Sequence, residues 1–84
     1  MFCVVSYDIV DDRRRNKAAK ILLDFGQRVQ YSVFECLVDD EALDKLIKRL
    51  KGTVSEQKDS VRIYILCASC KKTARIIGLG QLND

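Results

Sequence analysis

A short apolar run near the N-terminus ends on a carboxylate and is soon followed by three arginines. Residues 2–8 have the apolar and β-branched side chains of a buried strand, and Asp8 stands where that strand should end. The acidic pair Asp11 and Asp12 follows, and then Arg13–Arg15. A carboxylate at a strand end, beside a basic helix start, is suited to holding a metal ion against a phosphate. The simpler alternative is that Asp8 only terminates the strand.

Basic residues are concentrated where the first helix is expected to begin. No acid stands between Arg13 and Lys20, and the cations in this stretch are Arg13, Arg14, Arg15, Lys17 and Lys20. Such a patch on one helix is typical of proteins that bind polyanions. The net charge of the chain is only +3, so a solvated helix face remains the other interpretation.

The length and composition indicate one small globular domain. The chain has 84 residues, and 48% of them are hydrophobic, which is normal for a globular protein and too high for disorder. No apolar run approaches the roughly 20 residues of a membrane span. The N-terminus lacks the basic start and uninterrupted apolar stretch of a signal peptide. We therefore expect a single domain over residues 1–84, located in the cytoplasm and not in a membrane.

The chain contains four cysteines and no histidine. Cys3 and Cys36 fall within strand-like runs and are expected to be small core residues. Cys67 and Cys70 form a CxxC pair, which could indicate zinc or redox chemistry. Zinc is disfavoured because a site needs four ligands and the chain offers no second pair. In a cytoplasmic protein the thiols are expected to be reduced.

The first helix is expected to follow directly on the acidic pair. Asp11 or Asp12 can serve as its N-cap, and apolar residues recur at helical spacing as far as Phe25. Gly26 is then placed to adopt the left-handed conformation that commonly ends a helix. The basic residues would lie near the first turn, where cations oppose the helix dipole, and that is mildly suggestive of function.

Alternating and helical patterns predict the remaining elements. Two strands are expected within residues 27–38, with a corner near residues 31–33. An amphipathic helix capped by Asp39 or Asp40 follows them. The last elements are a strand over residues 59–67 and a short fifth strand over residues 73–80. The order β-α-β-β-α-β is the ferredoxin-like pattern, an α+β fold with an antiparallel sheet and two helices on one face. The uncovered face and the free edge predict a homodimer.

Three blocks of sequence at these spacings together resemble the CRISPR-associated Cas2 family. They are Tyr7–Ile9 with Asp12–Arg15, then Phe25–Glu35 with the run Val29–Glu35 inside it, then Asp59–Tyr64. The resemblance covers nearly the whole chain in the same order of elements. The chain departs from the family at Cys36, where many members have glycine, and in its short tail after Gly80.

The resemblance implies a small ferredoxin-like homodimer that acts with the Cas1 integrase in acquiring new CRISPR spacers and contacts double-stranded DNA. Several members are described as metal-dependent endonucleases on RNA or DNA, which implies an enzyme. Asp8 matches the family aspartate that faces its symmetry mate and shares a divalent ion, Mg²⁺ or Mn²⁺. One Asp8 alone would make a poor metal site, and two from two chains a usable one.

The resemblance and the basic run together give a set of expected nucleic-acid-binding residues. The set is Arg13, Arg14, Arg15, Lys17, Ser32 and Phe34. Arg14 and Arg15 would neutralise the phosphate backbone. Ser32 would position a phosphate, or it is only a turn residue. Phe34 would stack a base, or it belongs to the core.

Three functions from different classes remain open. The first is a structural DNA-binding adaptor in spacer integration, in which Asp8 is dispensable. The second is a metal-dependent phosphodiesterase with the Asp8 pair as its metal site. The third is a regulatory module that binds a small ligand between subunits, although the chain has no glycine-rich or pocket signature for that role. We favour the integration role, with a metal-dependent endonuclease as the expected activity.

Overall fold

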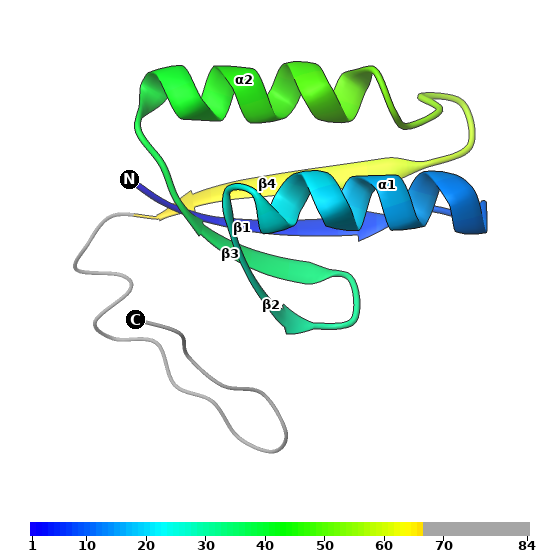
Figure 1. The fold of residues 1–84 in the computed structure, drawn as a ribbon, viewed down its shortest axis with the longest axis horizontal. Helices are drawn as coiled ribbons and strands as arrows, with labels where there is room; N and C mark the ends of the chain where they lie inside the picture. Colours follow the sequence, from blue (N-terminus) through cyan, green and yellow to red (C-terminus); the bar gives the residue numbers. More distant parts are fainter. Residues whose placement is uncertain (67–84) are drawn as a thin grey trace.

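The computed structural model describes residues 1–66, and these residues have the order of a ferredoxin-like fold (Figure 1). The elements are β1 (Phe2–Asp8), α1 (Asp12–Leu23), β2 (Gly26–Gln30), β3 (Val33–Leu37), α2 (Asp40–Lys51) and β4 (Ser60–Leu66). The strands form one antiparallel sheet in the order β2-β3-β1-β4. The predicted fold class is confirmed. The predicted fifth strand and the pair Cys67 and Cys70 lie outside the described residues.

The core lies between the helices and one face of the sheet. Alternation along β1 sends Cys3, Val5 and Tyr7 into this core, and Asp8 belongs to the opposite face. The helices contribute Ala18, Ala19, Ile21, Leu22, Leu43, Leu46 and Leu50. The apolar stripes predicted for both helices are therefore confirmed. Within residues 1–66, neither helix is long and apolar enough to cross a bilayer.

Each helix begins at an aspartate that accepts a backbone hydrogen bond. The Asp11 carboxylate accepts from the backbone N–H of Arg14 at 2.9 Å, and that bond lowers the pKa of Asp11. The Asp39 carboxylate caps α2 in the same way, at 2.8 Å from the backbone nitrogen of Ala42. These bonds satisfy N–H groups that have no partner inside a helix. The first cap makes α1 begin only four residues after Asp8.

Gly26 does not end α1 in a left-handed conformation, so that prediction was wrong. The helix stops at Leu23 with Asp24 as a right-handed C-cap, and Gly26 is the first residue of β2. A Cβ atom on Gly26 would lie 2.0 Å from the carbonyl oxygen of Glu35 and 2.7 Å from the Cα of Cys36. Glycine is needed here because β2 approaches the backbone of β3 too closely for a side chain.

The substitution Gly26→Ala should therefore destabilise the protein by about 1–3 kcal/mol, because two backbone segments must move apart. For a domain of this size we expect the melting temperature to fall by about 5 °C or more. Circular dichroism during heating measures this shift. Gly52→Ala is the matched control, since its Cβ would come no closer than 3.6 Å to another atom. Equal melting temperatures for the two variants would show that the close approach of β2 to the β3 backbone at Gly26 does not limit stability.

Cys3 and Cys36 face each other in the core. They are register partners in β1 and β3, and both thiols are free. Burial raises the pKa of each thiol, that of Cys36 to about 11 with a further contribution from Cys3. Both are therefore protonated and unreactive, as expected of core residues.

Candidate metal and nucleic-acid site

Asp8 is the last residue of β1, and its side chain is exposed. It belongs to the sheet face that the helices leave uncovered, which we call the open face. Within residues 1–66 its carboxylate makes no ion pair and accepts no hydrogen bond. An exposed carboxylate without a partner remains available to a cation.

A hollow on the open face includes Asp8. It has a volume of about 250 Å³ and is lined by Ser6, Tyr7, Asp8, Ser60, Arg62 and Tyr64. The pairing of β1 with β4 creates it, since Asp8 lies opposite Ser60 and Ser6 lies opposite Arg62. Arg62 and Tyr64 lie in the strand that the sequence predicts over residues 59–67. The sequence did not connect them with Asp8, because the β1–β4 register depends on the tertiary fold.

A second hollow, of about 370 Å³, lies between the end of β1, α1 and the turn from β2 to β3. It is lined by Tyr7, Asp8, Ile9, Arg15, Asn16, Ala19, Arg28, Tyr31 and Ser32. Asp8 therefore borders both hollows. The corner predicted near residues 31–33 is confirmed as a turn at Tyr31 and Ser32. The carbonyl oxygen of Ser32 accepts a hydrogen bond from the backbone N–H of Tyr7 at 3.0 Å, which holds this turn against β1.

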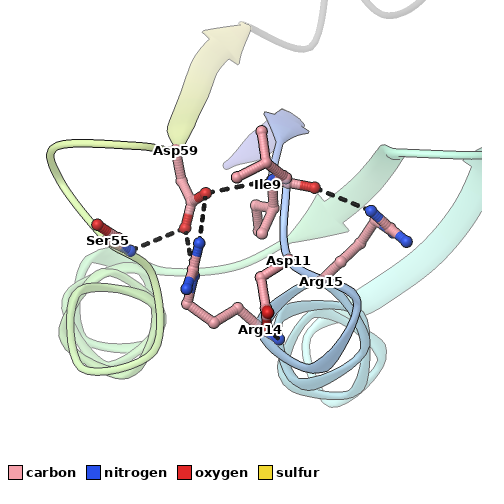
Figure 2. A network of polar contacts seen from close by, with 7 residues as sticks. Ile9, Asp11, Arg14, Arg15, Ser55 and Asp59 are labelled. Carbon is pink, nitrogen blue, oxygen red and sulfur yellow. Dashed lines mark hydrogen bonds and ion pairs between the residues drawn. The ribbon is translucent and has the colours of Figure 1, made fainter.

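Arg14 is engaged in an ion pair with Asp59 (Figure 2). Its Nε donates to Asp59 Oδ2 at 2.8 Å, and its Nη2 donates to Oδ1 at 3.2 Å. The Asp59 side chain has no exposed surface, and it also accepts from the backbone nitrogens of Ser55 at 2.8 Å and Val10 at 3.3 Å. This network ties α1 and the start of β4 to the chain that follows Asp8.

The other predicted basic residues remain available to a ligand to different degrees. Arg15 donates from Nη1 to the carbonyl oxygen of Ile9 at 3.0 Å and pairs with Asp12 through Nη2, yet 42% of its side chain is exposed. Figure 2 shows Arg14 and Arg15 pointing in different directions from α1. The side chains of Arg13 and Lys17 are exposed and form no ion pair within the described part of the chain.

Phe34 is fully buried. Its ring stacks on Tyr7 with 6.1 Å between the centroids, and the guanidinium carbon of Arg28 lies 5.2 Å from the Phe34 centroid. A base could reach this ring only if the core opened. The position therefore favours the core role that the sequence left open for Phe34, and it places Arg28 between the core and the second hollow.

The comparisons with known proteins settle the family of this chain. A family model described as "CRISPR associated protein Cas2" matches residues 1–74. The chain belongs to the Cas2 family. The resemblance read from the three sequence blocks is thereby confirmed.

Individual Cas2 proteins are similar to this chain over most of their length. "CRISPR-associated endoribonuclease Cas2 1" of Chloroflexus aurantiacus is 47% identical, over 95% of this chain and 87% of the relative. "CRISPR-associated endonuclease Cas2 2" of Thermus thermophilus is 40% identical, over 95% of this chain and 84% of the relative. The crystal structure of Streptococcus pyogenes Cas2 superposes with a TM-score of 0.84 at 34% identity, over 93% of this chain and 100% of that one. The names of these relatives support the prediction of an enzyme.

Residues 1–66 of this chain offer only part of a metal site. Within residues 1–66, no three His, Cys, Asp or Glu side chains come together in a group that could hold a metal ion. Asp8 fits as one oxygen ligand because it is exposed and has no competing partner among the described residues. Mg²⁺ keeps several waters and is held by one or two carboxylates together with substrate phosphates.

Proposed function

We propose that this Cas2 protein is a metal-dependent endonuclease that cleaves RNA or DNA, with Asp8 as its catalytic residue. The observation that carries the proposal is the Asp8 carboxylate at the end of β1, which is exposed, has no partner within residues 1–66 and lies between two hollows lined by arginines. The names of two relatives, an endoribonuclease and an endonuclease, support the reaction class. The first name specifies RNA and the second specifies no nucleic acid, so we propose both RNA and DNA as substrates.

The active form is a homodimer in which the open faces of two chains meet. Leu37 and Tyr64 belong to this face and are 74% and 50% exposed, which is unfavourable for large apolar side chains in a lone chain. A two-fold axis at this face would bring the two Asp8 carboxylates toward each other. The pair, with a substrate phosphate, would satisfy Mg²⁺ or Mn²⁺.

The chain's own residues would hold the substrate and position the metal. A divalent ion bound by Asp8 would polarise a phosphoryl oxygen and activate water as the nucleophile. Arg15 and Arg28 line the hollow beside Asp8 and would neutralise neighbouring phosphates. The backbone bond from Tyr7 to Ser32 would hold the Ser32 hydroxyl near these phosphates as a further donor. Hydrolysis would form a bond from the water oxygen to phosphorus and break the bond from phosphorus to one ribose or deoxyribose oxygen. The attacking water would lose a proton, and the leaving oxygen would take up a proton from solvent and depart as a hydroxyl.

The biological role that we propose is acquisition of new CRISPR spacers together with the Cas1 integrase. The exposed side chains of Arg13 and Lys17 on α1 support it, because they can contact the backbone of duplex DNA. In the alternative, the protein is a structural adaptor and only this basic surface is used. Two assays, nucleic-acid cleavage and Cas1-dependent integration, separate the nuclease from the adaptor when each is measured with wild type and with Asp8→Ala. If Asp8→Ala loses cleavage but retains integration, the protein is a nuclease whose activity is separate from adaptation. If both proteins integrate and neither cleaves, the protein is a structural adaptor.

Because Arg14 is paired with Asp59, we do not propose Arg14 as a DNA contact. We expect Arg13→Ala combined with Lys17→Ala to weaken duplex binding and to flatten its salt dependence. The slope of log affinity against log salt should fall by about 0.9 for each lost phosphate contact. Fluorescence anisotropy titrations from about 50 to 200 mM salt measure this slope.

Arg14→Ala is the control for this experiment, because it removes a charge from the same helix. Its slope should match that of wild type at a temperature where the variant is folded. A reduced slope for Arg14→Ala, with no change for the double variant, would show that the interface has been assigned to the wrong side of α1.

A further inference from the structure

We infer that Arg62 is a substrate-binding residue that holds a phosphate of the nucleic acid on the open face beside Asp8. The inference rests on the proposed nuclease function and adds a specific contact to it. Arg62 did not belong to the expected nucleic-acid-binding set, whose basic members all lie on α1.

The sheet register places Arg62 within reach of the same ligand as Asp8. Asp8 lies opposite Ser60, and Arg62 is two residues further along β4, so the two side chains are diagonal neighbours on one face. Diagonal neighbours in an antiparallel pair have Cα atoms about 7–8 Å apart, a gap that an arginine side chain can span. Both residues line the same hollow. A phosphate bound there can touch the guanidinium and a metal ion on Asp8 together.

Arg62 is also unengaged within residues 1–66, whereas three of the other five described arginines form ion pairs. Arg14 pairs with Asp59, Arg15 with Asp12 and Arg49 with Asp24. Arg62 is exposed and, within residues 1–66, forms no ion pair or hydrogen bond through its side chain. It lies near Asp8 without pairing with it. Both groups therefore keep their full capacity for a ligand.

The charges of the proposed dimer explain which ligand fits. Two Asp8 carboxylates are balanced by one divalent cation, and Arg62 forms no ion pair within residues 1–66, so each Arg62 guanidinium can still bind an anion. Burying the two guanidinium groups between two open faces without an anion is strongly unfavourable. Phosphate groups of a nucleic acid supply that anion, and guanidinium binds two phosphate oxygens in a fork geometry. Tyr64, two residues further along β4 in the same hollow, offers a ring to the adjoining nucleoside.

The test compares Arg62→Ala and Arg62→Lys with wild type and with Lys48→Ala. Lys48 is exposed on α2, so its removal matches the change in net charge away from the site. We expect Arg62→Ala to bind a single-stranded RNA oligonucleotide, made hydrolysis-resistant by phosphorothioate linkages, about tenfold more weakly in Mn²⁺. Arg62→Lys should recover part of the affinity, because lysine keeps the positive charge but cannot bind two phosphate oxygens as a guanidinium does. Lys48→Ala should bind as wild type does.

Two further readouts show whether Arg62 acts on the phosphate. Mn²⁺ affinity without RNA, followed by paramagnetic broadening of the Asp8 amide signal, should be unchanged in Arg62→Ala. Sedimentation should still show a dimer. The inference would be overturned by unchanged RNA affinity, by loss of the dimer, which would make Arg62 a subunit contact, or by an effect on Mn²⁺ affinity alone. Binding is measured apart from cleavage. If wild type fails to cleave, the nuclease proposal is refuted, but the binding data still show whether Arg62 binds phosphate.

Discussion

Asp8→Ala should reduce metal-dependent cleavage by at least about a hundredfold, because a metal ion supplies several kcal/mol of transition-state stabilisation. The variant should remain folded and dimeric, because the Asp8 side chain is exposed and forms no hydrogen bond or ion pair within residues 1–66. Initial rates on single-stranded RNA and double-stranded DNA in Mg²⁺ or Mn²⁺ measure the effect.

Asp44→Ala is the matched control for Asp8→Ala. Asp44 is an exposed carboxylate on α2 that forms no ion pair among the residues described. Its removal changes the net charge by the same amount away from the site and should leave the cleavage rate unchanged. Undiminished cleavage by rigorously purified Asp8→Ala would rule out Asp8 as the catalytic residue.

Asp59→Asn should lower the melting temperature by about 10 °C, the scale expected when charge-assisted hydrogen bonds are lost in a domain of this size. Asp59 accepts from the Arg14 guanidinium and from the backbone N–H groups of Ser55 and Val10. An amide nitrogen cannot accept any of these bonds, and the neutral amide leaves Arg14 without a counter-charge. Thermal unfolding by circular dichroism measures the loss.

The exposed pair between Arg49 and Asp24 provides the comparison for Asp59. Its atoms are 2.9 Å apart, and the Asp24 side chain is 62% exposed. Surface pairs of this kind contribute little to stability. Asp24→Asn should therefore change the melting temperature only slightly. Similar losses for Asp24→Asn and Asp59→Asn would mean that burial of the Asp59 network has no special importance.

The same network predicts how stability depends on pH. The Arg14 guanidinium, with smaller contributions from the Ser55 and Val10 N–H groups, lowers the pKa of Asp59 from 3.8 to about 2. A carboxyl group with a lowered pKa in the folded state adds stability above its unfolded pKa and loses it as the pH falls through the folded value. The melting temperature of wild type should therefore fall more steeply than that of Asp59→Asn between about pH 4 and pH 2. Parallel curves would contradict the assignment.

Much of the fold could be predicted because local patterns decide it. Alternation in β1 determined which residues face the helices, and the apolar stripe of α2 stood at helical spacing. Gly26 was misread because a glycine after a helix has two explanations. The sequence pattern does not show whether it adopts a left-handed conformation or makes room for another strand. Here the strand is β3, whose close backbone atoms belong to Glu35 and Cys36.

The site could be predicted only in part, because its contacts join distant segments. Asp8 was found from the end of a strand, which is a local signal. Arg14 and Arg15 are adjacent in a basic run, and only the fold shows that Arg14 points to Asp59, 45 residues away. Phe34 could not be assigned to the core or the surface until the sheet register was known. Arg28 and Arg62 were missed for the same reason, since β2 and β4 bring them to Asp8.

The central claim is that two Asp8 carboxylates form one metal-dependent site across a homodimer. Mixed dimers of one wild-type chain and one Asp8→Ala chain, isolated through two different affinity tags, test it directly. If the site is shared, the mixed dimer should cleave no faster than the dimer in which both chains carry Asp8→Ala. A mixed dimer that retains one working site, with the rate per intact Asp8 equal to that of wild type, would contradict a shared site.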